Sequence, residues 1–271
     1  MNKVMAVAAM ALLFCAAAYA ENKNGDDLYK EKKYSEALEA YQKDLSGLEG
    51  KNASRIQMMI GVSLMQMGRH EEAIEEFRKV KDIEGAHPSY VGASLFRAGS
   101  ILYKQKKYEE AIEEFRKVFD VEKVSVSIAT RSQQQIGYSL RAQGKLDEAV
   151  AELRKVKEIF GSVASVYVVD SQLVLGDILK SQGKNDEAEK EYKVALKDMS
   201  VSFSRLKKAL SNIKDFSDMA GTFVIQLKEG DEKNRELLIE KASQHKELAA
   251  EIVEAMPEDE AVVKALKPSA E

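Results

Sequence analysis

The ten residues EEAIEEFRKV occur twice, at 71–80 and again at 109–118, and every position is identical. The match extends further, because GRHEEAIEEFRKV at 68–80 aligns with KKYEEAIEEFRKV at 106–118. The second copy begins 38 residues after the first. A segment that recurs at a fixed offset is the signature of a repeat architecture, so the chain is expected to contain further copies.

Five copies of the repeat align on a glycine. The glycines are 36, 38, 38 and 39 residues apart: Gly25, Gly61, Gly99, Gly137 and Gly176. A leucine follows three residues after each glycine, an alanine twelve after and a large side chain sixteen after. The alanines are Ala37, Ala73, Ala111, Ala149 and Ala188, and the large side chains are Tyr41, Phe77, Phe115, Leu153 and Tyr192. Small residues at two such positions indicate a pair of antiparallel helices that cross closely.

A short polar segment separates the two helices of each copy. These segments are KEKK, MGRH, KQKK, AQGK and SQGK, at 30–33, 67–70, 104–107, 142–145 and 181–184. Gly68, Gly144 and Gly183 suit the left-handed conformation that ends a helix. Each copy is therefore predicted to be a helix-turn-helix unit.

The composition and motifs argue against several classes of protein. The 41 basic and 45 acidic residues give a net charge of −4, without the basic excess that nucleic-acid binding needs. No Gly-rich phosphate loop, GxSxG motif or metal-ligand spacing of the three histidines occurs. The glutamates alternate with Lys and Arg, which indicates solvated helix faces, with Glu114 pointing outward. We therefore expect no enzyme, no metal and no cofactor.

Residues 1–20 differ from the rest of the chain. MNKVMAVAAMALLFCAAAYA has one charge, an apolar run and an A-x-A site that ends at Ala20, as in a secretory signal peptide. The apolar run is shorter than the ~20 residues that span a membrane. The large Phe14 before Cys15 argues against lipidation at Cys15. We expect export and cleavage after Ala20, which also removes the only cysteine.

At the positions described above, the chain resembles the tetratricopeptide repeat (TPR) family. Its small residue at position 8, Leu or Tyr at 11, Ala at 20 and Phe or Tyr at 24 correspond to Gly61, Leu64, Ala73 and Phe77 of the second copy. The usual tryptophan at position 4 is replaced by Gln57, Leu95, Gln133 and Gln172, and the period exceeds the family's 34 residues. The resemblance implies an all-α, right-handed TPR solenoid of about five units over 21–199, followed by a helical region over 200–271.

Long-period repeats of this kind look like those of exported envelope proteins, including the outer-membrane β-barrel assembly lipoprotein and the periplasmic Tol–Pal accessory protein. The resemblance implies a groove that is lined by positions 2, 5, 9 and 12 of the first helices. The predicted partner-binding residues are Arg55, Met58, Met65, Phe96, Tyr103, Arg131, Gln134, Tyr138 and Arg141. We expect a third to half of such residues to serve contacts between units instead. Asp170 and Asp177 predict an acidic end to an otherwise basic and aromatic groove, suited to a peptide with some acidic character.

Residues 200–271 do not continue the repeat. Short apolar-periodic stretches occur at 203–213 and 222–230, and 231–255 is predicted to be one helix. Its apolar stripe consists of Leu238, Ala242, His245, Leu248 and Ile252. A last short helix is expected from Pro257, fading near Pro268. The region either caps the solenoid or mediates self-association through 231–255, which an exposed stripe would favour.

The sequence thus predicts an exported, non-catalytic scaffold, periplasmic or outer-membrane-associated and soluble after cleavage. Its partners would be protein or peptide segments of envelope proteins, in outer-membrane assembly or in coordination of the envelope with the cell wall. Two alternatives remain open. One is a self-assembling structural protein, and the other is a holdase-like chaperone that uses Met58, Met65 and Phe96 as an adaptable apolar strip.

Overall fold

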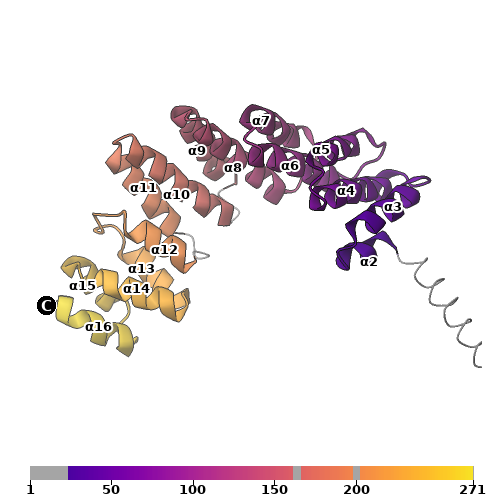
Figure 1. Cartoon of the computed structure of the whole chain (residues 1–271). Coiled ribbons are helices and arrows are strands. Elements are labelled where there is room, and N and C mark those ends of the chain that lie inside the picture. Colours follow the sequence, from indigo (N-terminus) through magenta and orange to yellow (C-terminus); the bar gives the residue numbers. More distant parts are fainter. Residues whose placement is uncertain (1–23, 161–165, 198–201, 271) are drawn as a thin grey trace, which may run out of the picture. The chain divides into compact units, whose positions relative to one another are not determined.

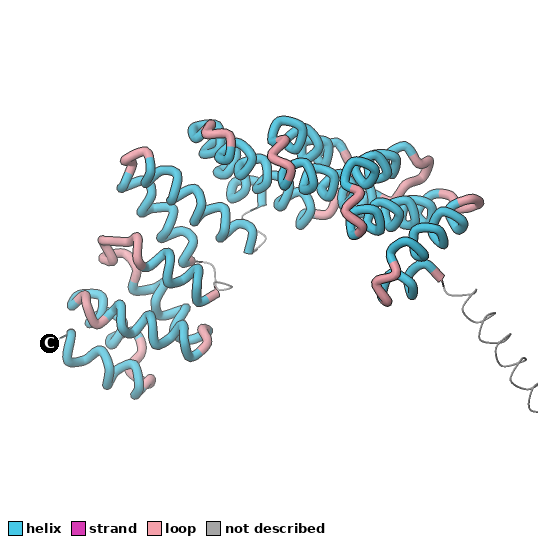
Figure 2. The backbone as a smooth tube through the Cα atoms, in the orientation of Figure 1, coloured by secondary structure: helices cyan, strands magenta, loops and turns pink. Residues whose placement is uncertain are grey.

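The computed structural model of the chain describes residues 24–160, 166–197 and 202–270. Within these ranges it contains 15 α-helices and no strand, which confirms the all-α TPR fold predicted from the sequence. Short turns join most successive helices (Figures 1 and 2). The predicted signal peptide at 1–20, with Cys15, lies outside the described residues.

The chain divides into two compact bodies, and the boundary between them falls within one helix. The N-terminal body ends at Ala129 and the C-terminal body begins at Thr130, inside α8 (Val126–Ala142). The N-terminal body contains α2 (Gly25–Lys30), α3 (Tyr34–Leu45), α4 (Gly50–Gln66), α5 (His70–Lys79), α6 (Pro88–Lys104) and α7 (Tyr108–Lys117). Short 3-10 turns, Val80–Asp82 and Val118–Asp120, extend α5 and α7.

The C-terminal body continues the same pattern of paired helices. It contains most of α8, then α9 (Leu146–Phe160), α10 (Val166–Ser181) and α11 (Asn185–Leu196). Five shorter helices follow: α12 (Phe203–Leu210), α13 (Ala220–Glu229), α14 (Glu232–Ala242), α15 (Lys246–Ala255) and α16 (Glu260–Ala270). The two short stretches predicted to be apolar-periodic are therefore helices α12 and α13.

The repeat glycines make room for the large side chain of the same hairpin. A Cβ atom at Gly61 would lie 2.7 Å from the ring of Phe77, and one at Gly99 would lie 2.7 Å from the ring of Phe115. Gly25, Gly137 and Gly176 meet Tyr41, Leu153 and Tyr192 in the same way. All five of these large side chains and all five repeat alanines are buried. The close helix crossing predicted from the sequence is confirmed.

The turns between the paired helices adopt the predicted conformation. Gly68, Gly144 and Gly183 have φ angles of 76°, 79° and 76°. In the two copies that lack this glycine, Lys32 and Lys106 adopt the same left-handed conformation, with φ angles of 62° and 63°. The turn geometry is therefore set by the helix pair, because it persists where the sequence offers no glycine.

Two predictions about individual segments were wrong. Residues 231–255 form two helices, α14 and α15, because the chain turns at 243–245 and His245 has extended backbone angles. Helix α16 begins at Glu260, three residues after the predicted start at Pro257, and runs through Pro268, where its end was predicted, to Ala270. The stripe predicted on the single helix is largely buried: Leu238, Ala242, Leu248 and Ile252 are at most 3% exposed. The observation that would have favoured self-association through this stripe is thus absent.

A third prediction, about the position of Glu114, was also wrong. It was expected to point outward, but it is 1% exposed. Its Oε1 atom accepts hydrogen bonds from Arg78 Nε at 2.8 Å and Lys117 Nζ at 2.9 Å. Arg78 comes from the preceding repeat, so a charged contact between repeats is what makes this burial tolerable.

Candidate functional site

The first helix of each hairpin carries the residues that the sequence assigns to partner binding. Residues three, four and seven apart share one side of a helix. The residues that lie six before, three before, one after and four after each glycine therefore form one row. We call these rows the N-terminal face, on α4 and α6, and the C-terminal face, on α8 and α10 together with α12.

The apolar part of the N-terminal face is half-buried and supported from beneath. Met58 packs against the buried cluster that contains Val91 and Leu95. The ring of Phe96 lies 5.6 Å from that of Phe115, and the ring of Tyr103 lies 5.5 Å from that of Tyr108. Met65 is also half-buried. These side chains are held in place while part of each remains exposed.

Arg55 of the same face contacts the preceding first helix. Its Nη1 atom donates to Asp26 Oδ2 at 3.0 Å, and the Tyr41 hydroxyl donates to Asp26 Oδ1 at 2.7 Å. Burial opposes ionisation of Asp26, but the hydrogen bonds from Tyr41 and Arg55 outweigh it, so the pKa of Asp26 is lowered. Arg55 therefore joins successive repeats, which is the role expected for part of the predicted set.

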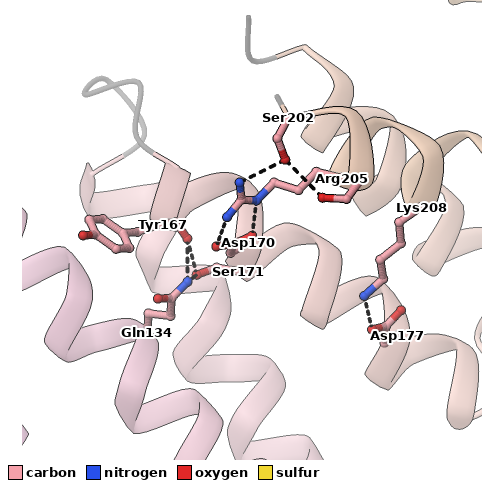
Figure 3. A network of polar contacts seen from close by, with 9 residues as sticks. Gln134, Tyr167, Asp170, Ser171, Asp177, Ser202, Arg205 and Lys208 are labelled. Carbon is pink, nitrogen blue, oxygen red and sulfur yellow. Dashed lines mark hydrogen bonds and ion pairs between the residues drawn. The ribbon is translucent and has the colours of Figure 1, made fainter. Parts of the chain in front are cut away.

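Gln134, which Figure 3 shows, and Arg131 both lie on α8 at the start of the C-terminal face. Gln134 is buried, and its Nε2 atom donates to the Tyr167 carbonyl at 2.9 Å and to Ser171 Oγ at 3.2 Å. The guanidinium of Arg131 lies 5.4 Å from the centre of the Tyr167 ring. Gln134 thus holds α8 against α10, while Arg131 stacks on an aromatic ring that remains half-buried.

The predicted acidic end of the groove is neutralised by α12, which corrects that expectation (Figure 3). Arg205 donates to both carboxylate oxygens of Asp170, with Nη2 at 2.8 Å from Oδ2. Lys208 Nζ donates to Asp177 Oδ2 at 2.6 Å. The hydrogen bond to Asp170 raises the pKa of the Arg205 guanidinium above its usual value, and the neighbouring Tyr138 adds to this shift. Both aspartates are therefore paired across the first helices.

Tyr138 and Arg141 complete the predicted set on α8. Tyr138 is half-buried and Arg141 is exposed, one helical turn further along the same row. Arg205 and Lys208 were not predicted as site residues. The available signal was their distance from Asp170 and Asp177, 35 and 31 residues, close to the repeat period.

Metal sites, membrane-spanning helices and pockets are other kinds of site that the described residues could form. Among residues 24–160, 166–197 and 202–270, no three His, Cys, Asp or Glu side chains converge on a point where a metal could bind. No helix in those ranges has the length and apolarity to cross a membrane. A small pocket of about 120 Å³ lies beside α10 and α11, lined by both charges, including Lys180, Glu189 and Lys214. It offers no concentrated chemistry comparable with the first-helix faces.

Two family models match the chain. The first, described as a tetratricopeptide repeat-like domain, matches residues 62–214, which is more than half of the 271 residues. The second, described as a tetratricopeptide repeat, matches residues 22–91. The chain belongs to the TPR family. These matches identify the repeat family and do not address export or a role in the cell envelope.

The chain is similar to several solved structures. The apo form of RapI has a TM-score of 0.56 and 14% identity, and the match covers 90% of this chain and 70% of RapI. MamA from Desulfovibrio magneticus RS-1 has a TM-score of 0.47 and 17% identity, with 64% and 89% covered. The Rap conjugation gene regulator of plasmid pLS20, solved with the Phr* peptide, has a TM-score of 0.46 and 17% identity. That match covers 90% of this chain and 70% of the regulator. No curated protein matches the chain.

A TPR array is suited to binding proteins, because stacked hairpins present rows of side chains from successive first helices on a rigid support. In this TPR protein, Arg55 and Gln134 donate hydrogen bonds to a neighbouring repeat. Two more of the nine predicted residues contact the next repeat, because Arg131 stacks on Tyr167 and Met58 packs against the cluster that contains Val91 and Leu95. Apart from Arg55 and Gln134, each predicted residue is half-buried or exposed on one of the two faces.

Proposed function

We propose that the chain is an exported, non-catalytic TPR scaffold that binds segments of envelope proteins through its first-helix faces. The observation that carries the binding part is the row of partly exposed Met, aromatic and Arg side chains on successive first helices. These residue types are enriched at protein interfaces. Here they are fixed by internal contacts such as that between Phe96 and Phe115, so little side-chain entropy is lost on binding.

Export rests on the N-terminal pattern of charge, apolar run and A-x-A site over residues 1–20. Cell fractionation with N-terminal sequencing of the isolated protein tests it. The expected result is an exported chain that begins at Glu21. A chain that keeps its first residues and stays with the cytosolic fraction would refute export and leave the binding proposal standing.

A photo-crosslinking amino acid at Tyr138 tests binding in cells. The matched control carries the same crosslinker at Glu113, an exposed position on a second helix. A discrete partner captured from position 138 and missing from 113 is the expected result. Equal capture from both positions, or capture of nothing, would count against a scaffold that works through the first-helix faces.

A further inference from the structure

We propose that the C-terminal face binds an acidic, aromatic-containing segment of a partner protein, and that Arg205 and Lys208 on α12 set this preference. This inference rests on the proposed scaffold function and specifies the chemistry of its partner. It concerns the C-terminal body alone, where α8, α10 and α12 contribute to one face.

The charge of this face is opposite in sign to that of the whole chain. Five basic and two acidic side chains belong to it: Arg131, Arg141, Lys180, Arg205, Lys208, Asp170 and Asp177. The face is therefore positive by three charges in a chain whose net charge is −4. Complementary charge steers a partner towards such a surface and suppresses partners of the same sign.

The ion pairs to α12 decide which charges a partner meets. Without Arg205 and Lys208, two uncompensated carboxylates would offset most of the positive charge of the face, and its attraction for an acidic segment would be weak. When the ion pairs form, the charges of Asp170 and Asp177 are compensated by Arg205 and Lys208 of α12. The net charge that a partner meets on this face is then positive.

Arg205 also keeps capacity for a partner. Its Nε and Nη2 atoms serve Asp170 and its Nη1 atom donates to Ser202 Oγ at 3.2 Å. A guanidinium carries five N–H donors, so these three contacts do not exhaust it. Its side chain is 28% exposed and that of Lys208 is 40% exposed, so a carboxylate can reach both.

Aromatic side chains supply the apolar part of the face. Tyr167 is held beneath Arg131, and Tyr138 lies near Arg205, so cationic and aromatic groups alternate from α8 to α12. An aromatic residue of a partner can pack beside these rings, and glutamates on either side of it can meet the guanidinium groups. Three helices about 10 Å apart span ~20 Å, which an extended segment of roughly six residues covers.

The test measures fluorescence anisotropy of two labelled peptides with the full chain. In one peptide glutamates flank a single phenylalanine, and in the other every glutamate is replaced by glutamine. We expect only the acidic peptide to bind, with an affinity that falls as salt rises. Tighter binding of the glutamine peptide, of single-stranded DNA or of phosphatidylglycerol vesicles would overturn the proposal.

Substitutions separate the charge effect from a structural one. Arg205→Ala removes an attraction and exposes Asp170, so affinity should fall by about tenfold. Asp170→Asn keeps the shape and removes the opposing charge, so affinity should rise by about threefold. If Asp170→Asn weakens binding as much as Arg205→Ala does, the ion pair serves only to hold α12 and the proposal fails.

Arg154→Ala is the matched control. Arg154 pairs with Glu187 at 3.0 Å on the second helices, so the net charge changes equally away from the face. Its affinity for the acidic peptide should be unchanged, and an equal loss would overturn the proposal. Capture of a partner from Tyr138 in cells, without acidic-peptide binding, would refute this inference and keep the scaffold. Peptide binding without capture would do the reverse.

Discussion

The Tyr192 hydroxyl donates a hydrogen bond to Asp177 Oδ1 at 2.8 Å. Asp177 directly follows the repeat glycine Gly176 on the first helix of the same hairpin. Tyr41 and Asp26 repeat this arrangement at 2.7 Å. Burial raises the pKa of Tyr192, and the hydrogen bond to Asp177 raises it further, so the hydroxyl stays a donor. Tyrosine occurs at this repeat position only in the two copies where aspartate follows the glycine.

Tyr192→Phe should lower the free energy of unfolding by about 1 kcal/mol, because the ring stays and one hydrogen bond is lost. Urea denaturation followed by circular dichroism measures this. Phe77→Tyr is the reverse change, in a copy where Val62 takes the place of the aspartate. It should also destabilise, since its buried hydroxyl would face an apolar side chain. A stabilising Phe77→Tyr would contradict the pairing.

Gly99→Ala should destabilise the chain by about 1–3 kcal/mol, because its Cβ would overlap the ring of buried Phe115. Gly221→Ala is the control. Gly221 lies exposed in α13 with open space around it, so alanine there should stabilise by about 0.5–1 kcal/mol through helix propensity. Equal effects of the two changes in thermal unfolding would argue against the steric explanation.

Lys106→Gly should stabilise the chain by about 0.5–1 kcal/mol. Lys106 has a φ angle of 63°, which costs an L-residue more than it costs glycine, and this gain exceeds the entropy that glycine adds to the unfolded state. Lys107→Gly makes the same charge change at a φ angle of −83° and should not stabilise. If both variants shifted the urea midpoint by the same amount, relief of backbone strain at Lys106 would be excluded as the cause of the stabilisation.

The hairpins were predictable because what specifies them is local. Gly99, Ala111 and Phe115 lie within one copy, and each copy repeats the same close crossing, so the spacing alone identifies it. The candidate faces followed from the same period. Their rows could be counted from the glycines before any contact was known.

The remaining features depend on neighbours that the period does not describe. The pairing of Asp170 with Arg205 joins a repeat to a helix outside the repeat pattern, so the acidic end was mispredicted. Glu114 is buried because Arg78 of another copy reaches it. The turn at 243–245 was hidden by an apolar stripe, although Ser243 and Gln244 repeat the first residues of the turn SQGK at 181–184.

Glu114→Ala should cost about 2 kcal/mol, since it removes two charge-assisted hydrogen bonds from a buried site. The adjacent Glu113 is exposed, and Glu113→Ala should change the free energy of unfolding by less than about 0.5 kcal/mol. Guanidinium denaturation of both variants gives the comparison. Similar small effects would mean that burial of the Glu114 carboxylate offsets what its partners contribute.

The stability of the C-terminal body should fall as pH drops below the ordinary pKa of histidine. His245 packs with its ring 4.6 Å from that of Phe216, and its Nε2 atom is buried without a partner among the described residues. Burial, and then the charge of Lys241, lower its pKa. The folded chain therefore holds His245 neutral at a pH where the unfolded chain binds a proton.

This difference in pKa between the folded and unfolded chain sets the direction of the pH dependence of stability. The contribution of neutral His245 is fully present above the unfolded pKa of about 6.5 and is lost as pH falls towards the depressed folded value. His245→Gln should flatten the pH dependence of the urea midpoint between about pH 7.5 and pH 5.5. His70→Gln is the control, because His70 is exposed at the start of α5, and the profile of this variant should follow that of the unsubstituted chain. A His245→Gln profile as steep as the unsubstituted one would assign the acid sensitivity to other groups.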